Sequence, residues 1–213
     1  MESRVRNASR DDAAFLAWVI LTAGRAHVKR GIWEVVLNAP ENDCLRFLET
    51  LAVTGTHHLF HYSCFSIAEE GKDPVAGLGG YDAGMLGYQA LRQVLPEVYV
   101  KWGRMPPTEM MRGESPRITA CVPPSLEGAW VIESAATLPA FRKMGMMSRL
   151  LDDVLDKGRK RGFRQAQLSI YIGNTPAQRA YEKHGFKLLD EWRDPYFESQ
   201  IGSPGMARLV CAL

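Results

Sequence analysis

A short cationic loop is the stretch of this sequence best suited to binding an anion. Arg142 and Lys143 supply two positive charges, and Gly145 follows them just before a predicted helix. The first turn of a helix has backbone N–H groups without an internal acceptor, and the helix dipole adds partial positive charge there. Glycine lets a ligand approach the backbone closely. These residue types and their spacing predict a site for an anion such as a pyrophosphate.

Glu133 is a second residue suited to chemistry, because it interrupts an apolar strand. Val131, Ile132 and residues 135–138 are apolar or small, as expected of a strand buried on both faces. A carboxylate is costly there unless it has a partner or a task. Regular alternation would place it on the same face as Ala135. The two interpretations are a proton-transferring group and an ordinary strand residue that is solvated or paired with a cation.

A strand–loop–helix unit must position both features. Pro139 removes a backbone donor and biases Leu138 to an extended conformation, which ends the predicted strand. Beyond the loop, apolar residues recur at helical spacing. They are Met146, Leu150, Leu151, Val154 and Leu155. The helix is predicted to end at residues 159–162, where cations occupy the last turn and a glycine suits the left-handed exit.

The loop resembles the acyl-CoA motif of the GNAT superfamily of N-acyltransferases. That motif reads Arg/Gln-x-x-Gly-x-Gly/Ala between a strand and a helix, and Arg142 and Gly145 match it. Met147 departs from the last small residue; its amide can still donate, but its side chain must point away from the phosphates. Downstream, Asn174-x-x-Ala-x-x-Ala-Tyr-x-x-x-Gly-Phe resembles another GNAT motif. The pair occurs in the family's order and covers about residues 130–192.

The resemblance implies an α/β fold and a way of holding acetyl-CoA. The central sheet would be mixed and mostly antiparallel, with two parallel strands that splay apart around the pantetheine arm and helices on its faces. A backbone N–H of the central strand would polarise the thioester carbonyl. The cofactor-binding residues implied are Ala135, Ala136, Thr137, Arg142, Lys143, Met144, Gly145, Met146, Met147, Ser148 and Asn174. Small residues at 134–136 also suit plain sheet–helix packing, and Asn174 also suits a helix cap.

The implied reaction is transfer of an acetyl group from acetyl-CoA to a primary amine by direct attack in a ternary complex. An amine with a pKa near 10 is protonated at pH 7, and reaching the free base costs roughly 4 kcal/mol. Glu133 is the first candidate for the base that takes this proton, and Asp82 is the second. By resemblance, and because a phenol is a donor at pH 7, Tyr181 is the candidate acid for the departing thiolate. The alternative is a packing tyrosine, and His184 is interpreted as a helix C-terminal cation.

Composition narrows the class of protein and its partners. The chain has 213 residues, 46% of them hydrophobic, which predicts one domain over residues 1–213 with a sizeable core. Its 26 basic and 24 acidic residues give a net charge of +2, which offers no support for nucleic acid or a membrane as the main partner. No apolar secretory or membrane-spanning stretch is present. Scattered cysteines without a CxxC pair favour reduced thiols and a cytoplasmic protein.

The first half of the chain matches the GNAT pattern only in outline. Predicted strands cover residues 4–8, 58–68 and 75–81, and predicted helices cover 12–24 and 40–53. On a strand, His57 and His61 would share a face that His58 avoids, so a metal site is not expected. Later strands are predicted at 165–171, 186–192 and 206–213, with a helix capped by Thr175 and a loop over 194–205.

Residues 83–128 are predicted to form an insertion. A helix is expected over residues 84–99, followed by an extended, proline-rich return. The insertion would cover the acceptor cleft, or else serve as a contact in a homodimer or as surface elaboration.

Two rival functions remain open at this stage. One is a non-catalytic acyl-CoA-binding or interaction module on the same fold. The other is an unrelated phosphate-binding α/β protein, which ranks low because the sequence lacks both a Walker loop and a GxGxxG after a strand. The acceptor is left open between a small-molecule and a peptide amine, and the acyl group can be larger than acetyl.

Overall fold

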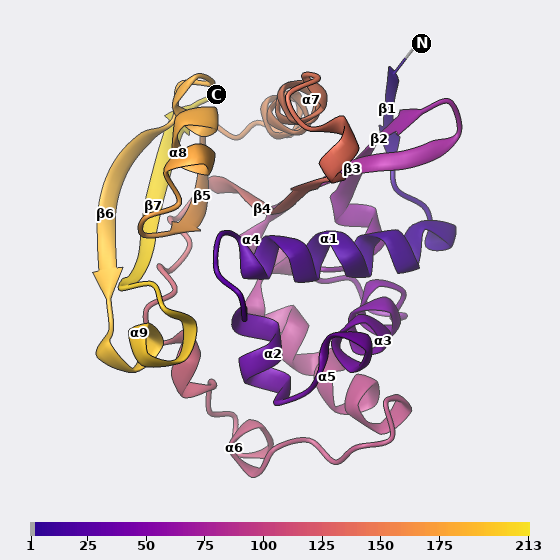
Figure 1. The fold of residues 1–213 in the computed structure, drawn as a ribbon, viewed down its shortest axis with the longest axis vertical. Helices are drawn as coiled ribbons and strands as arrows, with labels where there is room; N and C mark the ends of the chain where they lie inside the picture. Colours follow the sequence, from indigo (N-terminus) through magenta and orange to yellow (C-terminus); the bar gives the residue numbers. More distant parts are fainter. Residues whose placement is uncertain (1–2) are drawn as a thin grey trace.

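The computed structural model describes residues 3–213 and contains one seven-stranded mixed sheet (Figure 1). Its strands are β1 (Ser3–Asn7), β2 (Phe65–Glu70), β3 (Asp73–Asp82), β4 (Ala129–Thr137), β5 (Gln165–Tyr171), β6 (Lys187–Arg193) and β7 (Gly205–Ala212). The spatial order is β1-β2-β3-β4-β5-β7-β6, with β4 and β5 parallel and every other neighbouring pair antiparallel. The predicted fold class is confirmed; the first two residues of the predicted domain lie outside the described part.

Helices cover both faces of this sheet. They are α1 (Ala13–Arg25), α2 (Ile32–Leu37), α3 (Glu41–Ala52), α4 (Ala83–Leu86), α5 (Tyr88–Lys101), α6 (Thr108–Met111), α7 (Met146–Lys160), α8 (Thr175–Glu182) and α9 (Pro195–Ile201). Successive β4 side chains enter opposite cores: Val131 packs with α1 and α3, whereas Trp130 and Ile132 pack with α7. Within residues 3–213, no helix has the length and apolar character needed to cross a membrane.

Trp130 fixes the distance between α7 and the sheet. It is 1% exposed, and it lies between β3 and α7 where two glycines leave room for its indole ring. A Cβ atom at Gly158 would come within 2.8 Å of that ring, and one at Gly80 within 2.9 Å of its Nε1 atom. Larger residues at either glycine would push α7 outward, so α7 and its N-terminal loop depend on this close approach.

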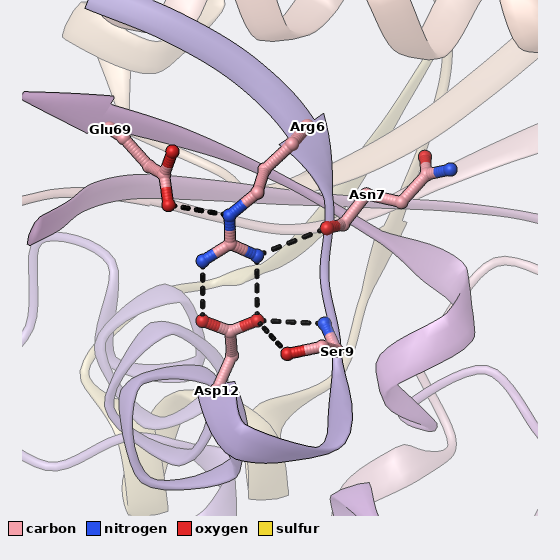
Figure 2. Close-up of polar contacts among 5 residues, drawn as sticks. All are labelled: Arg6, Asn7, Ser9, Asp12 and Glu69. Atoms are coloured by element: carbon pink, nitrogen blue, oxygen red, sulfur yellow. Dashed lines mark hydrogen bonds and ion pairs between the residues drawn. The ribbon is translucent and has the colours of Figure 1, made fainter. Parts of the chain in front are cut away.

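A partly buried polar cluster fixes the start of α1 to the edge of the sheet (Figure 2). Arg6 of β1 donates to both carboxylate oxygens of Asp12, at 2.7 and 2.8 Å, and its Nε donates to Glu69 of β2. The Asp12 carboxylate also accepts from the amide and hydroxyl of Ser9. Burial acts against the charge, but these hydrogen bonds hold the pKa of Asp12 below its usual value.

The predicted strand over residues 58–68 is wrong in its first half. Strand β2 begins only at Phe65, and His58 lies in a turn with its ring buried. Its Nε2 contacts Thr54 Oγ1 at 3.0 Å, and its Nδ1 accepts from the Phe60 amide. Alternating apolar residues resembled a strand, but local side chain–backbone hydrogen bonds favour the turn. The strand-face argument about the three histidines therefore does not apply.

The predicted loop over residues 194–205 is also wrong, because it contains helix α9. The Asp194 carboxylate accepts from the Phe197 amide at 2.8 Å, Pro195 occupies the first turn, and Gly202 leaves the helix in the left-handed region. This Asp-Pro start and glycine exit are sequence signals of a short helix. They were overlooked because the segment is only seven residues long.

The insertion over residues 83–128 is attached to the rest of the fold at both ends. Its predicted helix is two helices, α4 and α5, separated at Gly87. Helix α5 packs on α3, where Tyr99 and Trp102 pack edge-on to Phe47. At the other end, the Leu126 amide donates to Gln167 and Arg208 donates to the Pro124 carbonyl, at 2.6 and 2.7 Å. Figure 1 shows the insertion passing below α2 between these two attachments.

Candidate functional site

The loop before α7 leaves a row of backbone donors free. Lys143 and Gly145 both have positive φ angles, +64° and +81°, and Gly145 caps the helix that begins at Met146. Among the described residues, none accepts a backbone hydrogen bond from the amides of residues 143–148. A Cβ atom built at Gly145 would meet nothing within 4 Å. With Arg142 and Lys143 exposed beside it, this loop is an open, positively polarised cradle suited to an anion.

The neighbouring strands β4 and β5 separate beside this cradle. Their parallel pairing runs from Ala129–Gln165 to Ile132–Leu168 and then stops, although β4 continues to Thr137 and β5 to Tyr171. The β4 edge from Glu133 to Thr137 therefore has no strand partner on its β5 side within the described chain. An extended ligand with amide groups can hydrogen-bond to such an edge.

A bulge in β4 changes which side chains share a face. Ser134 has a φ angle of +54°, and the register with β3 shifts there, so that Gly79 pairs with Glu133 but Gly77 pairs with Ala136. Glu133 and Ala136 thus face α1, whereas Ala135 packs with the core under α7. The predicted shared face of Glu133 and Ala135 is wrong, because the extra residue of the bulge reverses the alternation.

Glu133 is a half-buried carboxyl group with an altered acidity. Burial raises its pKa to about 7, although the amide and hydroxyl of Ser134 donate to it at 3.2 and 3.4 Å and act in the opposite direction. No Lys or Arg of the described chain forms an ion pair with it. A carboxyl group with a pKa near the working pH can both accept and release a proton, as a general base requires.

Four tyrosines lie within electrostatic reach of Glu133. Burial, with the charge of Glu133 in addition, raises the pKa of Tyr181 on α8, so its hydroxyl stays protonated. Tyr81, which is also buried, is affected in the same way, and Tyr88 lies near enough to be influenced by the charge of Glu133. Tyr171 has a structural task, since its hydroxyl donates to the Gly24 carbonyl at 2.5 Å and so fixes the end of α1. Sequence reasoning singled out Tyr181 but missed Tyr81, Tyr88 and Tyr171, because tyrosines within apolar runs resemble core residues.

Asn174 acts as the cap of α8. Its Oδ1 accepts from the Ala177 amide at 3.4 Å, and Thr175 is the first residue of the helix. The predicted cap at Thr175 is therefore wrong by one residue. Because only Oδ1 is used by the cap, the Nδ2 group of Asn174 keeps two donors for a ligand.

His184 joins the end of α8 to the start of α7. Its Nε2 lies 3.1 Å from the Ser148 hydroxyl, and its Nδ1 lies 3.6 Å from Asp152. No sequence signal could have predicted this contact, because it joins residues 36 positions apart. His184 is thus a link between the two helices beside the cradle rather than a simple helix-end cation.

One cleft of about 1070 Å³ connects these features. Glu133, Tyr181 and ten of the eleven predicted cofactor-binding residues line it; the exception, Met144, is exposed outside it. Asp82, the second candidate base, does not line it and instead accepts from the Gly84 amide at the start of α4. From the cradle the cleft continues past Glu133 to α2, α5 and the insertion. The arrangement can hold an anionic, extended ligand at one end and a second molecule at the other.

Comparison with known proteins shows which family the sequence matches. The model of the acetyltransferase (GNAT) family matches residues 33–186. No curated protein sequence matches the chain.

Solved structures show the same fold. An acetyltransferase crystal structure is 18% identical, aligns over 98% of both chains and has a TM-score of 0.66. An N-acetyltransferase from Staphylococcus aureus Mu50 is 16% identical over 97% of this chain and 99% of its own, with a TM-score of 0.63. The N-acetylglutamate synthase from Neisseria gonorrhoeae, solved with coenzyme A and N-acetyl-glutamate, is 14% identical and aligns over 100% of this chain and 35% of its own, with a TM-score of 0.53.

Proposed function

Because the chain belongs to the GNAT acetyltransferase family, we propose that it transfers an acetyl group from acetyl-CoA to a primary amine. The observation that carries this proposal is the row of free amides at residues 143–148, which opens into the same cleft as Glu133. An anion-binding helix start beside a proton acceptor is what an acyl-CoA-dependent transfer requires.

The residues of the cradle fit acetyl-CoA. The amides of residues 143–148, with Arg142 and Lys143, would bind the pyrophosphate. The free edge of β4 at Ala135, Ala136 and Thr137 would pair with the pantetheine arm, and Asn174 would donate to the same arm. The side chains of Met146 and Met147 pack into the core under α7, which leaves their amides available. When bound, acetyl-CoA supplies an activated acyl group.

Glu133 and Tyr181 would carry the proton transfers. Glu133 accepts a proton from the ammonium form of the acceptor, directly or through water, and so provides a path for a deprotonation that costs about 4 kcal/mol at pH 7. A free N–H of the β4 edge stabilises the oxyanion that forms as the amine attacks the thioester carbonyl. Tyr181 donates its phenolic proton to the thiolate as the C–S bond breaks.

The second candidate is a non-catalytic acyl-CoA-binding module. It is the weaker one, because Glu133 has a pKa of about 7 and no described Lys or Arg pairs with it, which destabilises the folded state when the carboxyl group is charged. A mere binding module would gain nothing from this carboxyl group. The two candidates differ in one outcome, since the module would bind acetyl-CoA without acetylating any amine.

The test is release of free CoA from acetyl-CoA in the presence of primary amines, followed by mass spectrometry of the acetylated product. We expect amine-dependent turnover. The Tyr181→Phe variant should lower kcat by about 10²–10⁴-fold, since it lacks the proton donor. Its Kd for acetyl-CoA should change less than about threefold, because the phenol does not hold the nucleotide.

Tyr196→Phe is the matched control. Tyr196 is 40% exposed and lies outside the cleft, so its loss should leave kcat unchanged. Equal turnover in wild type and Tyr181→Phe would remove Tyr181 from the mechanism. Tight acetyl-CoA binding without acetylation of any amine would favour the binding module instead.

A further inference from the structure

The half of the cleft beyond Glu133 has apolar and aromatic walls. Helix α2 contributes Trp33 and Val36, α5 contributes Tyr88, Leu91 and Leu95, and the insertion contributes Met110. Trp33, Val36, Leu95 and Met110 are only partly buried by the protein itself, and Tyr88 is 42% exposed. Their side chains therefore present apolar surface to whatever occupies this half of the cleft.

These walls are held in place before a ligand arrives. Trp33 packs edge-on against Phe60, with ring centroids 5.0 Å apart. The start of α2 is fixed by Tyr171, whose hydroxyl accepts from the Ile32 amide, and by the ion pair of Glu34 with Arg25 at 2.8 Å. A preformed apolar wall favours ligands with a large apolar surface. Its side chains are already ordered, so binding costs little conformational entropy.

The charges of the cleft argue against polycationic acceptors. Its acidic residues are Glu114 and Glu133, whereas Arg92, Arg142, Lys143 and Lys183 are cations. A polyamine or an aminoglycoside brings several ammonium groups, each of which needs a carboxylate or water when it is buried. One ammonium group can be accommodated beside Glu133. The other carboxylate, Glu114, is exposed on the insertion, so we expect the part of the acceptor in the apolar half of the cleft to be uncharged.

We propose that the acceptor is a primary amine that carries one bulky apolar group, as in an arylalkylamine. The ammonium group lies beside Glu133, and the apolar group lies between α2 and α5 against Trp33 and Leu95. This inference rests on the proposed acetyl-CoA-dependent activity and specifies the acceptor of the same cleft.

The experiment compares three primary amines at fixed acetyl-CoA with the wild-type protein. The kcat/KM for 2-phenylethylamine should exceed those for ethanolamine and spermidine by about 10–100-fold, since only the phenyl group buries apolar surface in the walls. A kcat/KM for ethanolamine or spermidine equal to or above that for 2-phenylethylamine would overturn the inference while leaving the acetyltransferase activity intact. Binding of acetyl-CoA without acetylation of any of the three would also overturn it. Absence of acetyl-CoA binding would instead contradict the proposed function.

A pair of variants on α5 locates the selecting wall. Leu95→Glu places a carboxylate in the wall and should lower the ratio of kcat/KM for 2-phenylethylamine over spermidine at least about tenfold. Val100→Glu, on the same helix but 66% exposed and outside the cleft, should leave the ratio unchanged. Thermal melting of both variants checks that they fold. If Leu95→Glu does not fold, the three-amine comparison on the wild type still decides the inference. An unchanged ratio in folded Leu95→Glu would overturn the assignment of this wall.

Discussion

At the residue scale, the proposed catalysis depends on the environment of one carboxyl group. Glu133 could be identified from the sequence because a charge in an apolar strand is conspicuous. The structure adds why its acidity is altered: burial raises its pKa to about 7, and no Lys or Arg among residues 3–213 forms an ion pair with it. Its face on the strand could not be predicted, since the bulge at Ser134 depends on pairing with β3 and leaves no period in the sequence. Tyr81 and Tyr88 were missed for a related reason, because only the fold brings them near Glu133.

Replacement of Glu133 tests its role as the base. The Glu133→Gln variant should lower kcat/KM by about 10²–10⁴-fold at pH 7, because the amide cannot accept the ammonium proton. In the wild type, kcat/KM should rise with pH as Glu133 loses its proton near pH 7, and the variant should lack this limb. A rate profile is the measurement. An unaltered limb in Glu133→Gln would assign the titration to another group.

The stability of the same variant can be tested without a substrate. The pKa of Glu133 is about 7 in the folded protein and near 4.5 in a free carboxyl group, so the folded state holds this proton more tightly. The resulting stabilisation is fully present below pH 4.5 and is lost as the pH rises through 7. The free energy of unfolding of Glu133→Gln, relative to that of the wild type, should therefore rise by up to about 3 kcal/mol between pH 5 and pH 8.5.

Chemical denaturation at the two pH values measures this gain. Glu127→Gln, which removes an exposed carboxylate, is the control and should show no such change. The raised pKa would be contradicted if the free energies of unfolding of Glu133→Gln and wild type differed by the same amount at both pH values.

At the element scale, the start of α7 is what the sequence predicted best. Its glycine, its cations and the change from strand to helix periodicity all depend on neighbouring residues. Such local preferences agree with the folded structure. Elements whose conformation depends on a few capping contacts were predicted poorly. The turn around His58 and the short helix α9 are examples, since side chain–backbone hydrogen bonds decide both.

The two ends of α7 offer a matched pair of variants. Gly145 and Gly162 have φ angles of +81° and +86°, and a Cβ atom would meet nothing within 4 Å at either one. Alanine should cost about 1–2 kcal/mol of stability at each, because the left-handed conformation strains an L-residue. Only Gly145→Ala should also weaken acetyl-CoA binding, at least about tenfold, because it alters the loop that presents the free amides.

Denaturation and calorimetry measure the two effects separately. Weakened acetyl-CoA binding by both variants to the same extent would mean that the loss reflects general destabilisation. Unchanged binding by Gly145→Ala would contradict the placement of the pyrophosphate on this loop.

At the scale of the whole molecule, the cleft is formed by segments that lie far apart in the sequence. The GNAT resemblance predicted the gap between β4 and β5, because the two motifs that imply it span residues 130–192. The path of the insertion could not be predicted, since its attachments to α3, Gln167 and Arg208 are long-range. The apolar walls of the acceptor half depend on that path, and so does the proposed preference for an arylalkylamine.

Hydrogen–deuterium exchange of residues 143–148, with and without acetyl-CoA, is the decisive measurement of whether this loop binds the pyrophosphate. Amides without an acceptor exchange fast in the free protein, and hydrogen bonds to a bound pyrophosphate would slow them. We expect saturating acetyl-CoA to slow exchange in this segment at least about tenfold, with little change at the far end of α7. Unaltered exchange in a protein saturated with acetyl-CoA, or slow exchange already in the free protein, would contradict the account.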